Sequence, residues 1–310
     1  MNFVLPPAVS GEDRTIDDRA GPVTVRVAGA GRPLLLLHSI NAAASAAEVA
    51  PVHEWAAQRC RVYTPDLPGY GRSDRSDRRY SIRLFTDAVH DLVDLIGREH
   101  GDDVPVDALG LSLSSEFLAR AASERPERFR RLILVTPTGF DKRGERWRGP
   151  PGSSREVGWL KRFFEKPKVG EFLFRQLTRP SVVRYFLKRT FGTDAIDEQL
   201  WAYCCQSVGH PDARHAPFAF LSAQLFSADI RTILEQLDMP VWLAHGTRGD
   251  FKDFSTAGWA AARDNWTVQA FPTGALPFFE TPQMFLEDLG RFLQLAEIGE
   301  LHARHDDGVQ

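Results

Sequence analysis

The sequence predicts an α/β fold in which a mostly parallel sheet carries helices on both faces and one long helical insertion. Two observations lead to this prediction. Short apolar runs alternate along the chain with longer stretches of helical periodicity, which is typical of a parallel sheet covered on both sides. Two of the apolar runs, 132–136 and 241–245, are separated by about a hundred residues, and this gap indicates the insertion.

Each expected element is identified by its local composition. The expected strands are short and rich in Val, Leu and Ile, and they cover residues 23–27, 33–38, 61–64, 104–109, 132–136, 241–245 and 267–271. The expected helices repeat apolar residues at helical spacing over residues 42–58, 82–97, 112–123 and 283–297. The glycine-containing segment 28–32 joins one strand to the next, so it indicates a turn and not a phosphate-binding loop.

The insertion, residues 141–238, is expected to form a helical cap over a core made of residues 1–140 and 239–310. Glycine and proline residues at 149–152 mark its entry, and short aromatic-rich helical patterns follow. Helices that cover a site bury one apolar stripe, so we expect a closed and mostly apolar pocket beneath them. The residues expected to line it are Phe163, Phe164, Trp201, Tyr203 and Phe220 of the cap and Asn41 of the core.

Charge is unevenly distributed along the chain. The net charge of -3 excludes an overall basic nucleic-acid binder. Residues 141–189, however, contain fourteen Lys or Arg against five Asp or Glu. This basic stretch is interpreted either as an ordinary solvated face or as a surface that attracts anions or contacts a membrane peripherally.

Cysteine usage and the N-terminal residues indicate the compartment. Of the three cysteines, Cys204 and Cys205 are adjacent in sequence, so no disulfide framework is indicated. The N-terminal residues have neither the basic nor the apolar run of a signal peptide, and no segment reaches membrane-spanning length. We therefore expect a soluble, cytoplasmic protein, and the sequence leaves its oligomeric state open.

The most informative stretch is the turn Gly110-Leu111-Ser112-Leu113-Ser114, which joins an apolar strand directly to a helical pattern. In a turn of this kind, a nucleophile elbow, the serine hydroxyl stands clear of the sheet and the following backbone N–H groups point at the group that it attacks. Ser112 is therefore the predicted nucleophile. The predicted oxyanion hole consists of the N–H groups of Leu113 and of Ile40, and Ser39 of the same loop is counted among its residues.

Four motifs in this order resemble the α/β-hydrolase superfamily, in its capped branch with serine at the elbow. They are LLLLHS, DLPGYGRSD, GLSLS and GALPFFETP, and the resemblance covers about residues 22–140 and 238–294. It implies a Ser-His-Asp triad in which Ser112 is the nucleophile and Asp250 the acid, with Asp253 as the alternative acid. Ala275 occupies the position of the expected histidine.

The alanine at this position bears directly on the chemistry. Removing the general base from a serine triad costs on the order of a million-fold in turnover. Two histidines of the cap, His210 and His215, are the candidates for a substitute base. Ala275 is either an engineered substitution or the natural residue of a divergent branch, and the departures at Ser39 and Ser114 favour divergence.

Three functions remain open at this point. The first is an enzyme that acts on a small apolar or lipid-like ester, acyl or carbonyl substrate through Ser112 and the oxyanion hole. The second is a non-hydrolytic enzyme on the same scaffold, of the lyase, cyclase or cofactor-free oxygenase type. The third is a catalytically inactive protein that binds a ligand under its cap. No cluster of His, Cys and carboxylates has metal-ligand spacing, so we expect neither a metal nor a cofactor.

Overall fold

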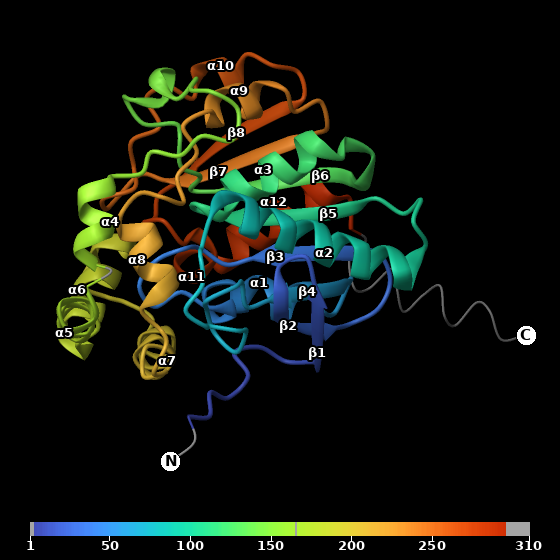
Figure 1. Cartoon of the computed structure of the whole chain (residues 1–310). Helices are drawn as coiled ribbons and strands as arrows, with labels where there is room; N and C mark the ends of the chain where they lie inside the picture. Colours follow the sequence, from blue (N-terminus) through green and yellow to red (C-terminus); the bar gives the residue numbers. More distant parts are fainter. Residues whose placement is uncertain (1–2, 165, 296–310) are drawn as a thin grey trace, which may run out of the picture.

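The computed structural model describes residues 3–164 and 166–295, and its centre is an eight-stranded sheet (Figure 1). The strand order is β1-β2-β4-β3-β5-β6-β7-β8. β1 and β2 form an antiparallel hairpin, β2 joins β4 antiparallel, and every later neighbouring pair is parallel. The predicted mostly parallel sheet is therefore confirmed. The strands are β1 (Glu12–Asp18), β2 (Gly21–Ala28), β3 (Pro33–Leu37), β4 (Arg61–Pro65), β5 (Val106–Leu111), β6 (Phe129–Val135), β7 (Val241–Gly246) and β8 (Trp266–Phe271).

The seven expected strands coincide with β2 to β8 to within a few residues, and β1 is the strand that the sequence did not reveal. Its sequence, EDRTIDD, is polar, and Ile16 is its one buried residue. β1 nevertheless pairs with β2 along its whole length, from Glu12 opposite Val27 to Asp18 opposite Gly21. Charged side chains are usual on an edge strand, so hydrophobic periodicity does not detect it.

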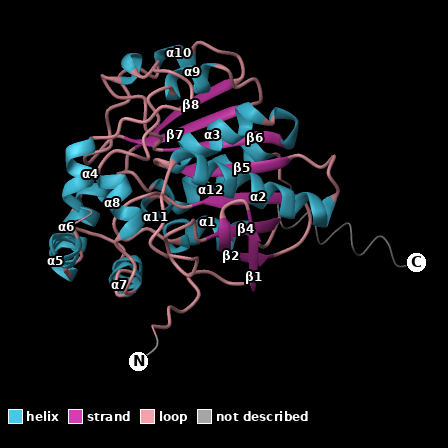
Figure 2. Cartoon of the chain, viewed as in Figure 1, coloured by secondary structure: helices cyan, strands magenta, loops and turns pink. Residues whose placement is uncertain are grey.

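Helices cover both faces of the sheet, as predicted (Figure 2). Successive residues of a strand point to opposite faces, and Leu35 and Leu37 of β3 join one apolar cluster while Leu34 and Leu36 join the other. The first cluster includes residues of α2, α3, α9 and α10, and the second includes residues of α1, α11 and α12. These helices are α1 (Ala50–Ala56), α2 (Ile82–His100), α3 (Ser114–Glu124), α9 (Ile230–Glu235), α10 (Gly258–Ala261), α11 (Pro277–Glu280) and α12 (Pro282–Leu293).

All four expected helices differ from the prediction at a boundary, and α2 extends to His100 instead of ending at residue 97. The helix expected over 42–58 is shorter, because the Asn41 side chain accepts the Ala43 N–H in a turn, and a 3₁₀ segment, Ala46–Val49, precedes α1. The helix expected from residue 112 begins two residues later, because Ser112 has φ +54°. The helix expected over 283–297 ends as α12 at Leu293, where Gln294 has φ +53°; residues 296 and 297 lie outside the described residues.

The segment 141–238 supplies five further helices that lie together on one side of the sheet in Figure 1. α9, at the end of the segment, lies apart from them, beside α10, and packs against α3 of the core. The expected cap over residues 141–238 stays a prediction, and the name cap is kept below for this segment. The five helices are α4 (Gly158–Phe164), α5 (Pro167–Leu177), α6 (Pro180–Phe191), α7 (Glu198–Ser207) and α8 (His215–Leu221).

Candidate active site

The turn between β5 and α3 holds Ser112 in a left-handed conformation, with φ +54°. A residue other than glycine in this region carries a backbone strain of about 1–2 kcal/mol, which folded proteins retain mainly at functional sites. The Ser112 N–H donates to the Val135 carbonyl at 2.8 Å, which holds the turn against β6. A Cβ on Gly110 would lie 3.0 Å from the Ser115 Cα, so the start of α3 packs closely on the strand. The half-buried Ser112 hydroxyl makes no hydrogen bond to another described residue.

Two backbone N–H groups, one directly after this serine and one in the loop after β3, have no acceptor within the described part of the chain. They belong to Leu113 and Ile40, whose residues are 1% and 2% exposed. Buried N–H groups without an acceptor are rare in folded proteins, so a buried pair of them is a candidate oxyanion hole. The Ser114 hydroxyl donates to the His38 carbonyl at 2.5 Å and thereby ties the elbow to the loop that contains Ile40.

The loop after β3 is held rigidly by one buried carboxylate. Glu48 accepts the Ser39 N–H at 2.9 Å and the Asn41 side-chain amide at 2.6 Å. Ser39, which the sequence placed among the residues of the oxyanion hole, therefore has its own N–H group occupied. The Asn41 side chain donates to Glu48 through its nitrogen and accepts the Ala43 N–H through its oxygen, so both of its polar atoms are engaged. Sequence reasoning missed Glu48, because the neighbouring residues, mostly alanine, give no sign that this glutamate is buried.

His38 completes the support of this loop. Its Nδ1 lies 2.6 Å from the Ser39 carbonyl, and its Nε2 accepts the Leu67 N–H at 2.9 Å. Both ring nitrogens are thus engaged, and the accepting Nε2 requires the neutral ring. Complete burial lowers the pKa of His38, which favours that neutral form.

The loops that would carry the acid and the histidine of a triad are both joined to the end of cap helix α6. The Asp250 N–H donates to the Arg189 carbonyl at 3.2 Å, and the Ala275 N–H donates to the Thr190 carbonyl at 2.8 Å. A Cβ on Gly274 would overlap the Thr190 carbonyl, so glycine is required beside this contact. The Asp250 carboxylate pairs with the Arg189 guanidinium, and both side chains are partly exposed. The candidate acid therefore faces a cap arginine.

Ala275 is connected to the elbow through Thr136, which follows β6. The Thr136 hydroxyl donates to the Ala275 carbonyl at 2.8 Å, and the preceding Val135 carbonyl accepts the Ser112 N–H. Thr136 itself has φ +45° and is buried. Ser112 and Ala275 are thus hydrogen-bonded to two consecutive residues, Val135 and Thr136 respectively. The alternative acid, Asp253, accepts the N–H groups of Lys142 and Ser255 at the surface.

The seven histidines within residues 3–295 all have polar partners other than Ser112. His210 accepts the Asp212 N–H at 3.1 Å, and its ring lies edge-on to Phe3. His215 places Nδ1 at 3.2 Å from the Asp77 carboxylate. Burial lowers the pKa of both side chains, which makes them neutral near pH 7. A role of either as substitute base stays a prediction, and in this arrangement neither bonds to the elbow serine. The other five are His38, His53, His90, His100 and His245.

The aromatic cap residues predicted for a single pocket lie in several different environments. Phe164 stacks on Phe218 of α8, and Phe163 is 40% exposed. The Trp201 indole N–H donates to the Pro180 carbonyl, and the Tyr203 hydroxyl donates to the Pro6 carbonyl. The remaining ring, Phe220, packs 5.5 Å from that of Phe226. Their joint contribution to a pocket over Ser112 stays a prediction.

A second buried carboxylate lies four residues after the nucleophile position, and sequence reasoning missed it. Glu116 accepts the Thr138 hydroxyl at 2.5 Å and the Ser227 N–H at 2.7 Å, and the Arg155 guanidinium lies 3.6 Å away. Burial raises the pKa of Glu116. Glu116 therefore fastens two cap segments, 149–157 and 222–228, onto α3. The segments are joined to each other by backbone bonds, such as the Arg155 N–H to the Phe226 carbonyl.

The basic cap helices expose several aromatic side chains. Trp159, Phe172, Tyr185 and Phe186 are all at least half exposed, on α4, α5 and α6. Exposed aromatic rings among Lys and Arg are compatible with peripheral membrane contact, which stays a prediction. In the part of the chain that the structure describes, no helix combines the length and the hydrophobicity needed to cross a bilayer. Over the same residues, no three metal-ligating side chains come together.

Comparison with known proteins adds family and fold information. The model of the family described as "alpha/beta hydrolase fold" matches residues 32–207. An uncharacterized protein of Mycobacterium tuberculosis is 33% identical over 289 residues, covering 89% of this chain and 79% of that protein. A pimeloyl-[acyl-carrier protein] methyl ester esterase of Nitrosomonas europaea is 27% identical and covers 85% of this chain and 96% of its own length. The structure of a probable hydrolytic enzyme from Pseudomonas aeruginosa superposes with a TM-score of 0.70 at 17% identity, covering 93% and 96% of the two chains.

Proposed function

Because the chain belongs to the α/β-hydrolase fold family, we propose that it is an enzyme that acts on an apolar ester, acyl or carbonyl substrate through Ser112. One observation supports the proposal: a strained serine with an open hydroxyl precedes a buried N–H group without an acceptor in the described chain, and the loop tied to this turn by Ser114 contains a second such group. The similarity to an esterase over most of both chains supports a carbonyl substrate.

The geometry suggests how the site acts on an ester. The carbonyl oxygen lies between the N–H groups of Ile40 and Leu113, which stabilise the negative charge that develops when the Ser112 oxygen attacks. The Ser112 oxygen forms a bond to the carbonyl carbon, the bond to the leaving alkoxide breaks, and water protonates the alkoxide. The serine proton passes to water or hydroxide, because no described histidine bonds to Ser112. The oxyanion hole and binding alone are worth about 10³–10⁴-fold over the uncatalysed reaction.

A second candidate, a non-hydrolytic enzyme on the same scaffold, is favoured by the surroundings of Ala275. The position expected for the base is an alanine, and the candidate acid Asp250 is paired with Arg189. An oxyanion hole without a base suits a reaction that stabilises an enolate and forms no acyl-enzyme. The third possibility, a ligand-binding protein without catalysis, predicts that Ser112 shows no enhanced reactivity at all.

Labelling with a fluorophosphonate probe tests the proposed nucleophile. We expect slow but selective labelling of the peptide that contains Ser112, because the oxyanion hole stabilises the phosphoryl oxygen even without a histidine. Ser112→Ala should abolish the label. Ser123→Ala, on the same helix α3, is the matched control and should keep it. Labelling that is absent from Ser112, or that persists in Ser112→Ala, would refute a covalent role for this residue.

A further inference from the structure

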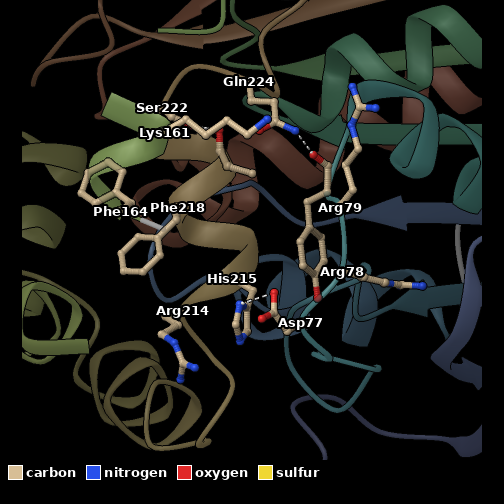
Figure 3. A pocket seen from close by; sticks show the side chains of 12 residues that line it. Asp77, Arg78, Arg79, Lys161, Phe164, Arg214, His215, Phe218, Ser222 and Gln224 are labelled. Atoms are coloured by element: carbon tan, nitrogen blue, oxygen red, sulfur yellow. Dashed lines mark hydrogen bonds and ion pairs between the residues drawn. The ribbon is translucent and has the colours of Figure 1, made fainter. Parts of the chain in front are cut away.

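A cavity of about 660 Å³ lies between the segment 77–80, helix α4 and helix α8 (Figure 3). Ser112, Ile40 and Leu113 are not among the residues that line it. Its volume falls in the range of about 300–1,000 Å³ that is typical of pockets for small organic ligands. The reaction proposed at Ser112 therefore does not account for this cavity.

One wall of the cavity is a fixed aromatic surface. The rings of Phe164 and Phe218 are parallel to within 3°, with centroids 4.8 Å apart, and Figure 3 shows them side by side. Phe174 of α5 packs edge-on against Phe218 at 6.0 Å. Because neighbouring rings hold both aromatic planes, the wall offers a preformed flat surface to an aromatic ring or an acyl chain.

One acidic residue, Asp77, is among the residues that line the cavity. The Asp77 carboxylate lies 3.2 Å from His215 Nδ1, and Figure 3 shows the two side chains directed at each other. Positive charge, by contrast, comes from four Lys or Arg residues in the lining. Because four cations outnumber one carboxylate, the lining is electropositive and favours an anion.

The four cations differ in their availability. Arg78 donates to the Ala20 carbonyl at 2.8 Å and is directed away from the cavity in Figure 3, and Arg214 donates to the Pro211 carbonyl at 2.9 Å. Lys161 has one distant partner, a Glu156 carboxylate oxygen at 3.4 Å. The Arg79 guanidinium has no hydrogen bond or ion pair to any residue that the structure describes. Lys161 and Arg79 are thus the cations left to meet a ligand.

A buried amide fixes the two sides of the cavity relative to each other. Gln224, from the cap, donates through Nε2 to the Tyr80 carbonyl at 2.5 Å. Both residues line the cavity and are buried. The backbone beside Arg79 is therefore joined to the segment 222–228, and both Arg79 and Lys161 line the same cavity.

We propose that this cavity binds a small amphipathic anion, namely a carboxylate attached to an aromatic ring or a short acyl chain. The carboxylate contacts the Lys161 ammonium and the Arg79 guanidinium, which are strong charge-assisted donors. The apolar part lies against Phe164 and Phe218. The proposal goes beyond the proposed function, since binding here requires no reaction at Ser112.

Isothermal titration calorimetry with 4-phenylbutyrate and its neutral amide tests the proposal. We expect the acid to bind at least about ten-fold more tightly than the amide, because only the acid forms charge-assisted bonds. Lys161→Gln and Arg79→Gln should each weaken binding of the acid about ten-fold. Arg162→Gln, the next residue on α4 and not part of the lining, is the matched control and should leave the affinity unchanged.

The proposal is overturned if the acid does not bind, if acid and amide bind equally, or if Lys161→Gln and Arg162→Gln have equal effects. Lys161→Gln and Arg79→Gln separate this cavity from the elbow, because both residues line the cavity and Ser112 does not. Binding of 4-phenylbutyrate that both variants leave unchanged would place the acid elsewhere, the elbow included, and overturn the proposal. Failure of fluorophosphonate labelling leaves these binding outcomes unaffected, so the two proposals fail separately.

Discussion

Asp229→Ala is expected to destabilise the protein by about 3–5 kcal/mol, because it leaves a buried arginine without its counter-charge. Arg120 of α3 and Asp229 form an ion pair at 2.6 Å, and both side chains are at most one-tenth exposed. The same carboxylate accepts the Gly152 N–H at 2.7 Å and so fastens the entry of the cap. Equilibrium unfolding in urea, followed by circular dichroism, measures the loss directly.

Two further variants show whether burial is the cause. Asp238→Ala, the matched control, removes an aspartate that is 93% exposed and lies 3.9 Å from Arg263; a surface pair of this kind contributes at most about 1 kcal/mol. The double variant Arg120→Met/Asp229→Leu should recover most of the stability, since an apolar pair replaces the charges. If Asp229→Ala unfolds at the same urea concentration as Asp238→Ala, the buried pair does not hold the cap on α3.

Ala275→His is expected to raise ester hydrolysis by about a hundred-fold at most, far short of the million-fold that a complete triad supplies. The backbone at this position is held by Thr190 and Thr136, so it should accept the substitution without large movement. A histidine without an orienting acid recovers only a small part of the rate. The Asp250 carboxylate pairs with Arg189 in this structure, so the orientation of a new histidine by Asp250 would have to compete with that pair.

The measurement is kcat/KM for p-nitrophenyl butyrate, with Ala275→Gln as a control of similar size and no basic nitrogen. A gain in both variants would point to altered packing, not to a new base. A gain of about 10⁴-fold or more in Ala275→His alone would mean that acid, nucleophile and donors are already aligned. In that case Ala275 replaces a recently lost or engineered histidine, and the divergent arrangement inferred from Asp250 is wrong.

Sequence reasoning predicted the sheet well, because β3 and β5 to β7 are apolar runs whose alternate residues fill both faces. It missed β1, whose stability comes from pairing with β2 and not from its own composition. It also overextended the first helix, since an Asn41 side-chain bond outweighs the helical pattern that follows. The family match and the sheet topology confirm the predicted α/β-hydrolase fold.

The site was predictable where its geometry is local. The glycine, serine and strand-to-helix order around Ser112 lie within a few residues, and the structure shows the left-handed turn that this order implies. Contacts between distant residues were not predictable, because no local pattern records them. Arg189 meets Asp250 across 61 positions, and Ser227 meets Glu116 across 111. The directions of the aromatic cap residues depend on how each helix is rotated about its axis, which such contacts determine.

Intact-protein mass spectrometry during reaction with p-nitrophenyl butyrate at pH 7 tests the central claim most directly. If Ser112 reacts on a backbone oxyanion hole without a histidine base, one butyryl group should accumulate slowly on the protein and not on Ser112→Ala, and digestion should locate it on the peptide that contains Ser112. The adduct should persist, because hydrolysis of the acyl-enzyme needs the same missing base, and its release should accelerate with hydroxide concentration. Rapid turnover at pH 7 without an accumulating adduct would contradict this account and require a general base near Ser112.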